Sequence, residues 1–127
     1  MKLRILLRLI AIVQLLLGGL YLLVPGWLLH AIGHSAAAPD LYYPLAMLAA
    51  RFIAYGIGLL MLAASPQPSR FWLQNMVLVQ VLDLLAGGWY TASGVVPLQL
   101  SAFPMFNAAL FAGLLWRWQP PRAEVAA

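Results

Sequence analysis

The chain has no cysteine and few charged residues. Without cysteine it can form no disulfide, thiolate metal site, thiol nucleophile or covalent c-type haem link. The absence of cysteine does not show whether the protein works in a reducing or an oxidising compartment. Only 8% of its 127 residues are charged, whereas soluble domains carry roughly 25%. The three acids, Asp40, Asp83 and Glu124, offer no paired carboxylates for acid–base catalysis. With no Ser/His/Asp set and no glycine-rich phosphate loop, we expect a protein that is not an enzyme.

What the chain has instead is apolar sequence, which makes up 65% of its residues. This composition is typical of a membrane protein, and the length fits one helical domain rather than two. The net charge of +4 could indicate binding to nucleic acid, but the basic residues form no patch with interleaved aromatic side chains. We therefore exclude nucleic acid as a partner and expect membrane lipid.

Four apolar segments are long enough to span a bilayer, because about 20 helical residues cover its hydrocarbon core of about 30 Å. They lie at about 3–24, 44–64, 71–91 and 98–118. A last helix beginning at Pro104 would be too short, so it either starts near Pro97 with Pro104 inside, or the bilayer thins around it. Residues 27–33 predict a short interfacial helix, and 119–127 a disordered cytoplasmic tail. The predicted fold is an all-α four-helix transmembrane bundle over 1–118.

Basic residues fall on one side of this four-span layout, and the two loops on the other side contain none. They are Lys2, Arg4, Arg8, Arg70, Arg117 and Arg122. This positive-inside pattern predicts that both termini are cytoplasmic, in a bacterial-type inner membrane. It also argues against a dual-topology protein, which would need a balanced charge distribution.

Two opposite charges are predicted within the spans. Arg51 lies in the segment Leu45–Ala64 and Asp83 in the span that follows it. At about 1.5 Å per residue, both are a few ångströms outward of mid-span, in antiparallel helices joined by a short connection. Each charge alone is costly in lipid, so we predict that they form an ion pair inside the bundle.

Four further polar residues lie near this predicted pair: Gln14, Tyr55, Gln80 and Asn107. Tyr55 is one helical turn from Arg51, and Gln80 is one turn from Asp83. All six could converge in one polar pocket. Such a set is either a hydrogen-bonded structural contact between helices or a binding site for a quinone, a lipid headgroup or another small amphiphile. No cofactor is required by the sequence.

Small residues also recur with helical spacing. Ala46, Ala50, Ala54 and Gly58 form one stripe that predicts close approach of a neighbouring helix. In addition, the segment 16–21, LLGGLY, is similar to the segment 85–90, LAGGWY. This weak repeat suggests two related hairpins in parallel orientation, although glycine pairs are also common by chance in leucine-rich helices.

Two histidines follow the first span. His30 and His34 are four residues apart, so on a helix they would point the same way and could bind a metal with Asp40 as third ligand. The alternative, which we favour, is that they are ordinary interfacial residues. We therefore predict no metal site and keep this pair as a weak candidate.

The chain resembles the DoxX-like group of small four-helix membrane proteins, which includes relatives of unknown function. The resembling residues are Ala50-Arg51-Phe52, Tyr55-Gly56-Ile57-Gly58-Leu59-Leu60, and Asp83 followed by Gly87. This resemblance implies the four-span layout and quinone-linked work, since the family name comes from a subunit associated with thiosulfate:quinone oxidoreduction. The chain has no cysteine and no convincing redox ligand, which argues against an oxidoreductase that works by itself.

Three functions follow as hypotheses. The first is an accessory or structural subunit of a larger membrane complex. The second is a quinone- or lipid-binding component of a membrane oxidoreductase of DoxX-like type. The third is a small transporter, although members of the small multidrug group carry a carboxylate in the first span, where this chain has Gln14.

Overall fold

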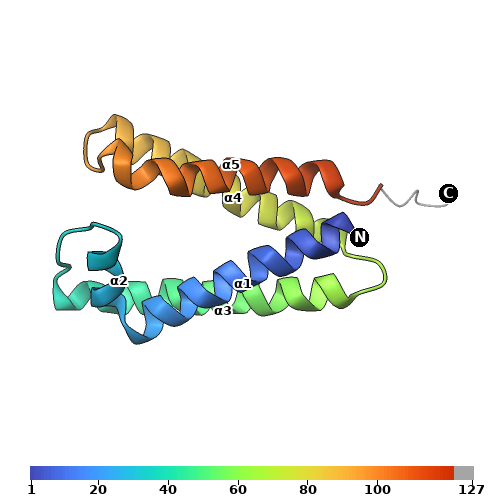
Figure 1. Cartoon of the computed structure of the whole chain (residues 1–127), viewed down its shortest axis with the longest axis horizontal. Coiled ribbons are helices and arrows are strands. Elements are labelled where there is room, and N and C mark those ends of the chain that lie inside the picture. The colour runs from blue at the N-terminus through green and yellow to red at the C-terminus, as the bar shows by residue number, and fades with distance from the viewer. Residues whose placement is uncertain (122–127) are drawn as a thin grey trace. The chain divides into compact units, whose positions relative to one another are not determined.

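The computed structural model describes residues 1–121, and their regular structure is entirely helical. The elements are α1 (Lys2–Leu23), α2 (Pro25–Ala31), the short 3-10 helix η1 (Pro39–Leu41), α3 (Tyr42–Ala64), α4 (Arg70–Ala92) and α5 (Leu98–Trp118). Helices α1, α3, α4 and α5 are long and apolar enough to cross a membrane (Figure 1). The predicted all-α fold with four membrane-spanning helices is confirmed, and each helix begins and ends within two residues of its predicted span.

The chain divides into two compact units. The first unit contains residues 4–64, and the second contains the described residues from 65 onward together with 1–3. The first unit holds most of α1 with α2, η1 and α3, and the second holds α4 and α5 (Figure 1). Each unit is therefore a helical hairpin.

Two glycines set the packing of α1 against α3. A Cβ atom on Gly18 would lie 2.7 Å from Ile53 Cγ1 and 3.1 Å from the Ala49 carbonyl oxygen. A Cβ atom on Gly56 would lie 2.6 Å from Leu15 Cγ. Only hydrogen fits at these two positions, so the two backbones approach closely there. Because the later glycine of α3 meets the earlier part of α1, the helices run antiparallel.

The stripe of small residues predicted on α3 is not the surface that packs on α1. Ala50, Ala54 and Gly58 are exposed, and a Cβ atom on Gly58 would meet nothing within 4 Å. The contact is made instead by the face that carries Ala49 and Gly56, both of which are buried. Both faces carry small residues at helical spacing, and sequence alone does not tell them apart.

The predicted short helix after the first span is present as α2, shifted toward the N-terminus. Pro25 stands at its first turn, where a missing N–H costs nothing. The helix ends after Ala31, and Gly33 has a φ of 87°, which reverses the chain as only glycine does easily. An aromatic contact between Tyr21 and Phe52, with ring centroids 6.0 Å apart, joins α1 to α3 near this end.

In the second unit, α4 and α5 are in contact from one end to the other. Thr91 meets Ser101 at the turn end, Gly87 lies against Met105, and Arg70 Nη1 donates a 2.8 Å hydrogen bond to the Pro120 carbonyl at the opposite end. Pro104 lies inside α5. The longer of the two predicted versions of the last span is therefore confirmed.

Most of the predicted disordered tail, 119–127, lies outside the described residues, because these end at 121. Its first residues follow α5 directly. Gln119 Nε2 donates to the Trp116 carbonyl at 3.0 Å, and Pro120 accepts the hydrogen bond from Arg70. Glu124 falls in the part that is not described.

Candidate functional site

The six polar residues predicted to form one pocket are divided between the two units. Gln14, Arg51 and Tyr55 belong to the first unit, and Gln80, Asp83 and Asn107 belong to the second. Each unit therefore supplies three members of the set, from two helices. Their convergence into one pocket stays a prediction.

In the first unit, one polar side chain of the predicted set is buried and the charged side chain of that set is exposed. Gln14 is 8% exposed, and its Oε1 atom has no hydrogen-bond partner among the described residues. Arg51 is exposed on α3. The unit's sole acid is Asp40, which precedes Arg51 by 11 residues, or about 16 Å along a helix axis. The charge of Arg51 is therefore not neutralised within this unit.

The second unit shows the same contrast on a single helix. Gln80 is 5% exposed, and among the described residues its Nε2 atom donates only to Met76 Sδ, at 3.8 Å. Asp83, one turn further along α4, is exposed. The described arginines of this hairpin, Arg70 and Arg117, lie at the opposite end of α4 and α5. Among the described residues of its own hairpin, Asp83 therefore has no cation within reach.

The predicted ion pair would give each of these two charges a counter-charge. A charge near the centre of a membrane helix costs about 2.5–3.5 kcal/mol on insertion scales. Arg51 and Asp83 are one cation and one anion, each exposed on its own hairpin, and neither has a counter-charge among the residues of that hairpin that the structure describes. The pairing of these two residues stays a prediction.

A polar contact that the sequence analysis missed joins α4 to α5. Thr91 Oγ1 lies 2.6 Å from the Gly87 carbonyl oxygen, to which it donates, and 2.6 Å from Ser101 Oγ. Since Thr91 has one hydroxyl proton, Ser101 donates to Thr91. Ser101 is buried. The sequence feature that could have indicated this contact is a hydroxyl residue on each side of a short turn between two apolar helices.

The helical premise of the predicted histidine pair is wrong. His30 is in α2, but this helix ends after Ala31, and the positive φ of Gly33 places His34 outside it. The backbone N–H of His34 instead donates to the Leu29 carbonyl at 2.9 Å. Among the residues that the structure describes, no three His, Asp or Glu side chains could jointly hold a metal ion.

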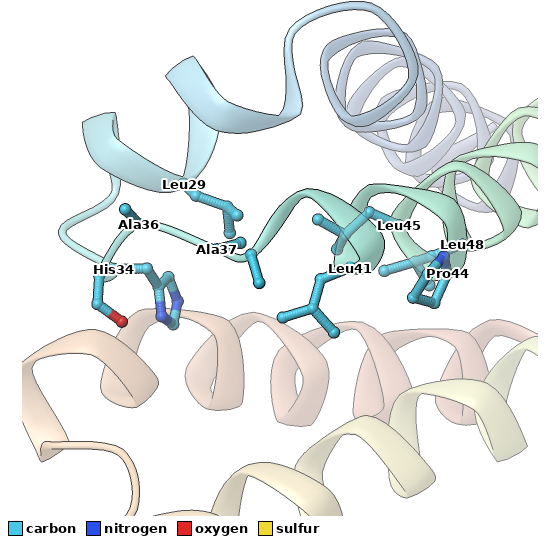
Figure 2. A pocket seen from close by; sticks show the side chains of 10 residues that line it. Leu29, His34, Ala36, Ala37, Leu41, Pro44, Leu45 and Leu48 are labelled. Atoms are coloured by element: carbon cyan, nitrogen blue, oxygen red, sulfur yellow. The ribbon is translucent and has the colours of Figure 1, made fainter.

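An open groove of about 480 Å³ lies in the first unit, where the loop after α2 meets the start of α3 (Figure 2). It is lined by Leu29, His34, Ser35, Ala36, Ala37, Ala38, Leu41, Pro44, Leu45 and Leu48. His34 lies at one end of the groove, and Leu48 and Pro44 lie at the other (Figure 2). The groove is thus apolar with one polar end, a shape that suits a small amphiphile. The small residues of the loop carry no motif, so the groove could not be predicted from the sequence.

Comparison with known proteins yields no similarity from which a function could be inferred. The chain matches no protein-family model, no curated protein and no solved structure. Function is therefore inferred from the helices, their exposed faces and the groove.

Proposed function

We propose that this chain is a non-enzymatic accessory subunit of a larger membrane complex, held in a bacterial-type inner membrane by four spans with both termini cytoplasmic. This role is compatible with the resemblance to the DoxX-like group. It requires a helix surface that another subunit can cover. The observation that supports such a role is the exposed stripe of small residues on α3.

This surface has the features of a helix-docking face. In lipid, helices associate through close packing of small residues, because burial of apolar surface supplies little driving force there. On α3 the contact with α1 uses one small-residue face and leaves Ala50, Ala54 and Gly58 exposed. The α3 helix thus carries a second face at which a neighbouring helix could come as close as α1 does.

The test is copurification in mild detergent, followed by mass spectrometry of bound proteins. The G58L variant places a large side chain on the docking face. We expect it to lose the copurifying subunit that the unaltered chain retains. The matched control is G88L, because Gly88 is also exposed on a long helix and has nothing within 4 Å of its Cβ position.

Two outcomes would contradict this proposal. One is an unaltered chain that purifies without any protein partner. The other is a G58L variant that keeps its partner as well as G88L does. If G58L instead lowers the stability of the isolated chain, the stripe is covered by the chain itself.

The groove favours a second function, the binding of a small amphiphile such as a quinone or a lipid. Its small loop residues Ala36, Ala37 and Ala38 leave the space that makes it a groove. We expect an A37F variant to fill this space and to lose binding of a short-chain benzoquinone, measured by quenching of tryptophan fluorescence. An A92F variant, altered at an exposed residue of the other hairpin, should bind normally. Equal binding by both variants would exclude the groove as the site.

A further inference from the structure

Among the described residues that line the groove of the first unit, one side chain is ionisable. It belongs to His34, and the others are leucine, alanine, proline and serine. The remaining ionisable residues of the segment 24–41, His30 and Asp40, do not line the groove. An imidazole donates hydrogen bonds and takes up positive charge at mildly acidic pH. The polar end of the groove therefore presents a donor, and no carboxylate is among its described lining residues.

Hydrogen bonds at both ends hold the loop that forms this polar end. The His34 N–H donates to the Leu29 carbonyl at 2.9 Å, so His34 stays beside the last turn of α2. The Leu41 N–H donates to the Ala38 carbonyl, also at 2.9 Å. Between these two bonds, no backbone N–H of residues 35–38 donates to a backbone carbonyl of the described chain. These N–H groups need acceptors from water or from a ligand.

The other end of the groove is formed by a membrane-spanning helix. Leu45 and Leu48 are in the first two turns of α3, and Pro44 lies beside Leu48 (Figure 2). His34 precedes the start of this candidate span at Pro39. The volume of about 480 Å³ is in the lower half of the range for small-molecule sites, about 300–1,000 Å³. The groove therefore fits one acyl chain, rather than the two of a phospholipid, with the head of the ligand outside the span.

We propose that the groove binds a fatty acid, with its carboxylate at His34 and its chain along Leu45 and Leu48. This inference rests on the second function proposed above, the binding of a small amphiphile in the groove, and gives its chemical class. A carboxylate only accepts hydrogen bonds, which matches the donors of the polar end. A quinone or a fatty alcohol is uncharged and gains no charge pairing with a protonated imidazole. Charge complementarity thus selects the acid.

The test is photoaffinity labelling of the full chain in mild detergent, followed by mass spectrometry of its peptides. The two labels are decanoic acid and decanol, each with a diazirine at the end of its chain. At about pH 6.5 a carboxylate is ionised and an imidazole is partly protonated. We expect the acid to label residues 29–48 at a concentration up to about fivefold lower than the alcohol, the factor that an exposed ion pair contributes.

Variants of the two histidines test the position of the carboxylate. The H34Q variant should lose the preference for the acid, whereas H34K keeps a positive charge and should retain it. The matched control is H30Q, because His30 is also exposed but does not line the groove. It should label as the unaltered chain does. Equal losses of preference in H34Q and H30Q, or in H34Q and H34K, would overturn the proposal.

The two labels also separate this inference from the function on which it rests. Equal labelling of the groove by acid and alcohol would overturn the fatty acid and leave the binding of an amphiphile intact. Labelling of the groove by neither compound would contradict both.

Discussion

At the scale of single residues, Arg51 and Asp83 carry the strongest energetic constraint. Each is exposed in a helix apolar enough to span a bilayer, and the described part of its hairpin holds no counter-charge for it. We expect R51A and D83A each to lower the free energy of unfolding in detergent. The double variant should lose less than the sum, with a coupling energy of about 1–3 kcal/mol, because it removes both members of the pair.

Exchanging the two charges tests the pair in a second way. The variant R51D/D83R should recover part of the stability that either single reversal loses. Additive losses in the double-alanine variant, together with no recovery in the exchange, would show that the two residues do not pair. In that case each charge would need a separate partner in lipid, protein or water.

The adjacent glycines Gly18 and Gly19 have different surroundings, so the same substitution should have different effects on stability at the two positions. A Cβ atom on Gly18 would clash with Ile53, whereas one on Gly19 would meet nothing within 4 Å. We expect G18A to lower the free energy of unfolding by about 1–3 kcal/mol, as overpacking does. The G19A variant should be neutral or slightly stabilising, because alanine favours the helix. Unfolding by denaturing detergent, followed by circular dichroism, checks both, and equal effects would contradict the described α1–α3 contact.

At the scale of elements, the hydroxyl contact near the turn holds the end of the α4–α5 hairpin. Thr91 and Ser101 are 2.6 Å apart, and Ser101 is buried. Removing either hydroxyl, in T91V or S101A, should cost about 0.6 kcal/mol and at most about 1.7, the range found for hydrogen bonds between membrane helices. The exposed Ser93, whose hydroxyl donates to the Tyr90 carbonyl within α4, provides the control S93A. A double variant with fully additive losses would contradict a shared hydrogen bond.

The bounds of the helices could be predicted from the sequence, but their packing faces could not. Apolar length locates a span, and prolines and glycines mark its ends, so α3 and α4 begin and end near the predicted residues. Packing depends on which small residues meet a neighbour. The face with Ala49 and Gly56 is buried and the one with Ala54 is exposed, although both have helical spacing. The groove and the Thr91–Ser101 contact were missed because each depends on how a loop folds back.

At the scale of the whole molecule, the two hairpins share one packing device. The first helix of each contains a glycine pair, Gly18-Gly19 in α1 and Gly87-Gly88 in α4. In each pair the first glycine lies against the following long helix and the second has open space. The weak sequence repeat therefore coincides with the same structural role in both units. This correspondence supports descent of the two hairpins from one duplicated unit.

The absence of cysteine allows the orientation of the whole chain to be measured directly. Single cysteines can be introduced at the exposed residues Ser35 and Ser93, which lie in the loops that we predict to be outside, and at Ser69 on the predicted inner side. In intact cells, a membrane-impermeant maleimide should label S35C and S93C but not S69C, which should react only after the membrane is opened. This order follows from the basic residues that precede and follow the spans. Labelling of S69C alone would show that the topology is the inverse of the predicted one, and labelling of all three would indicate a dual-topology protein.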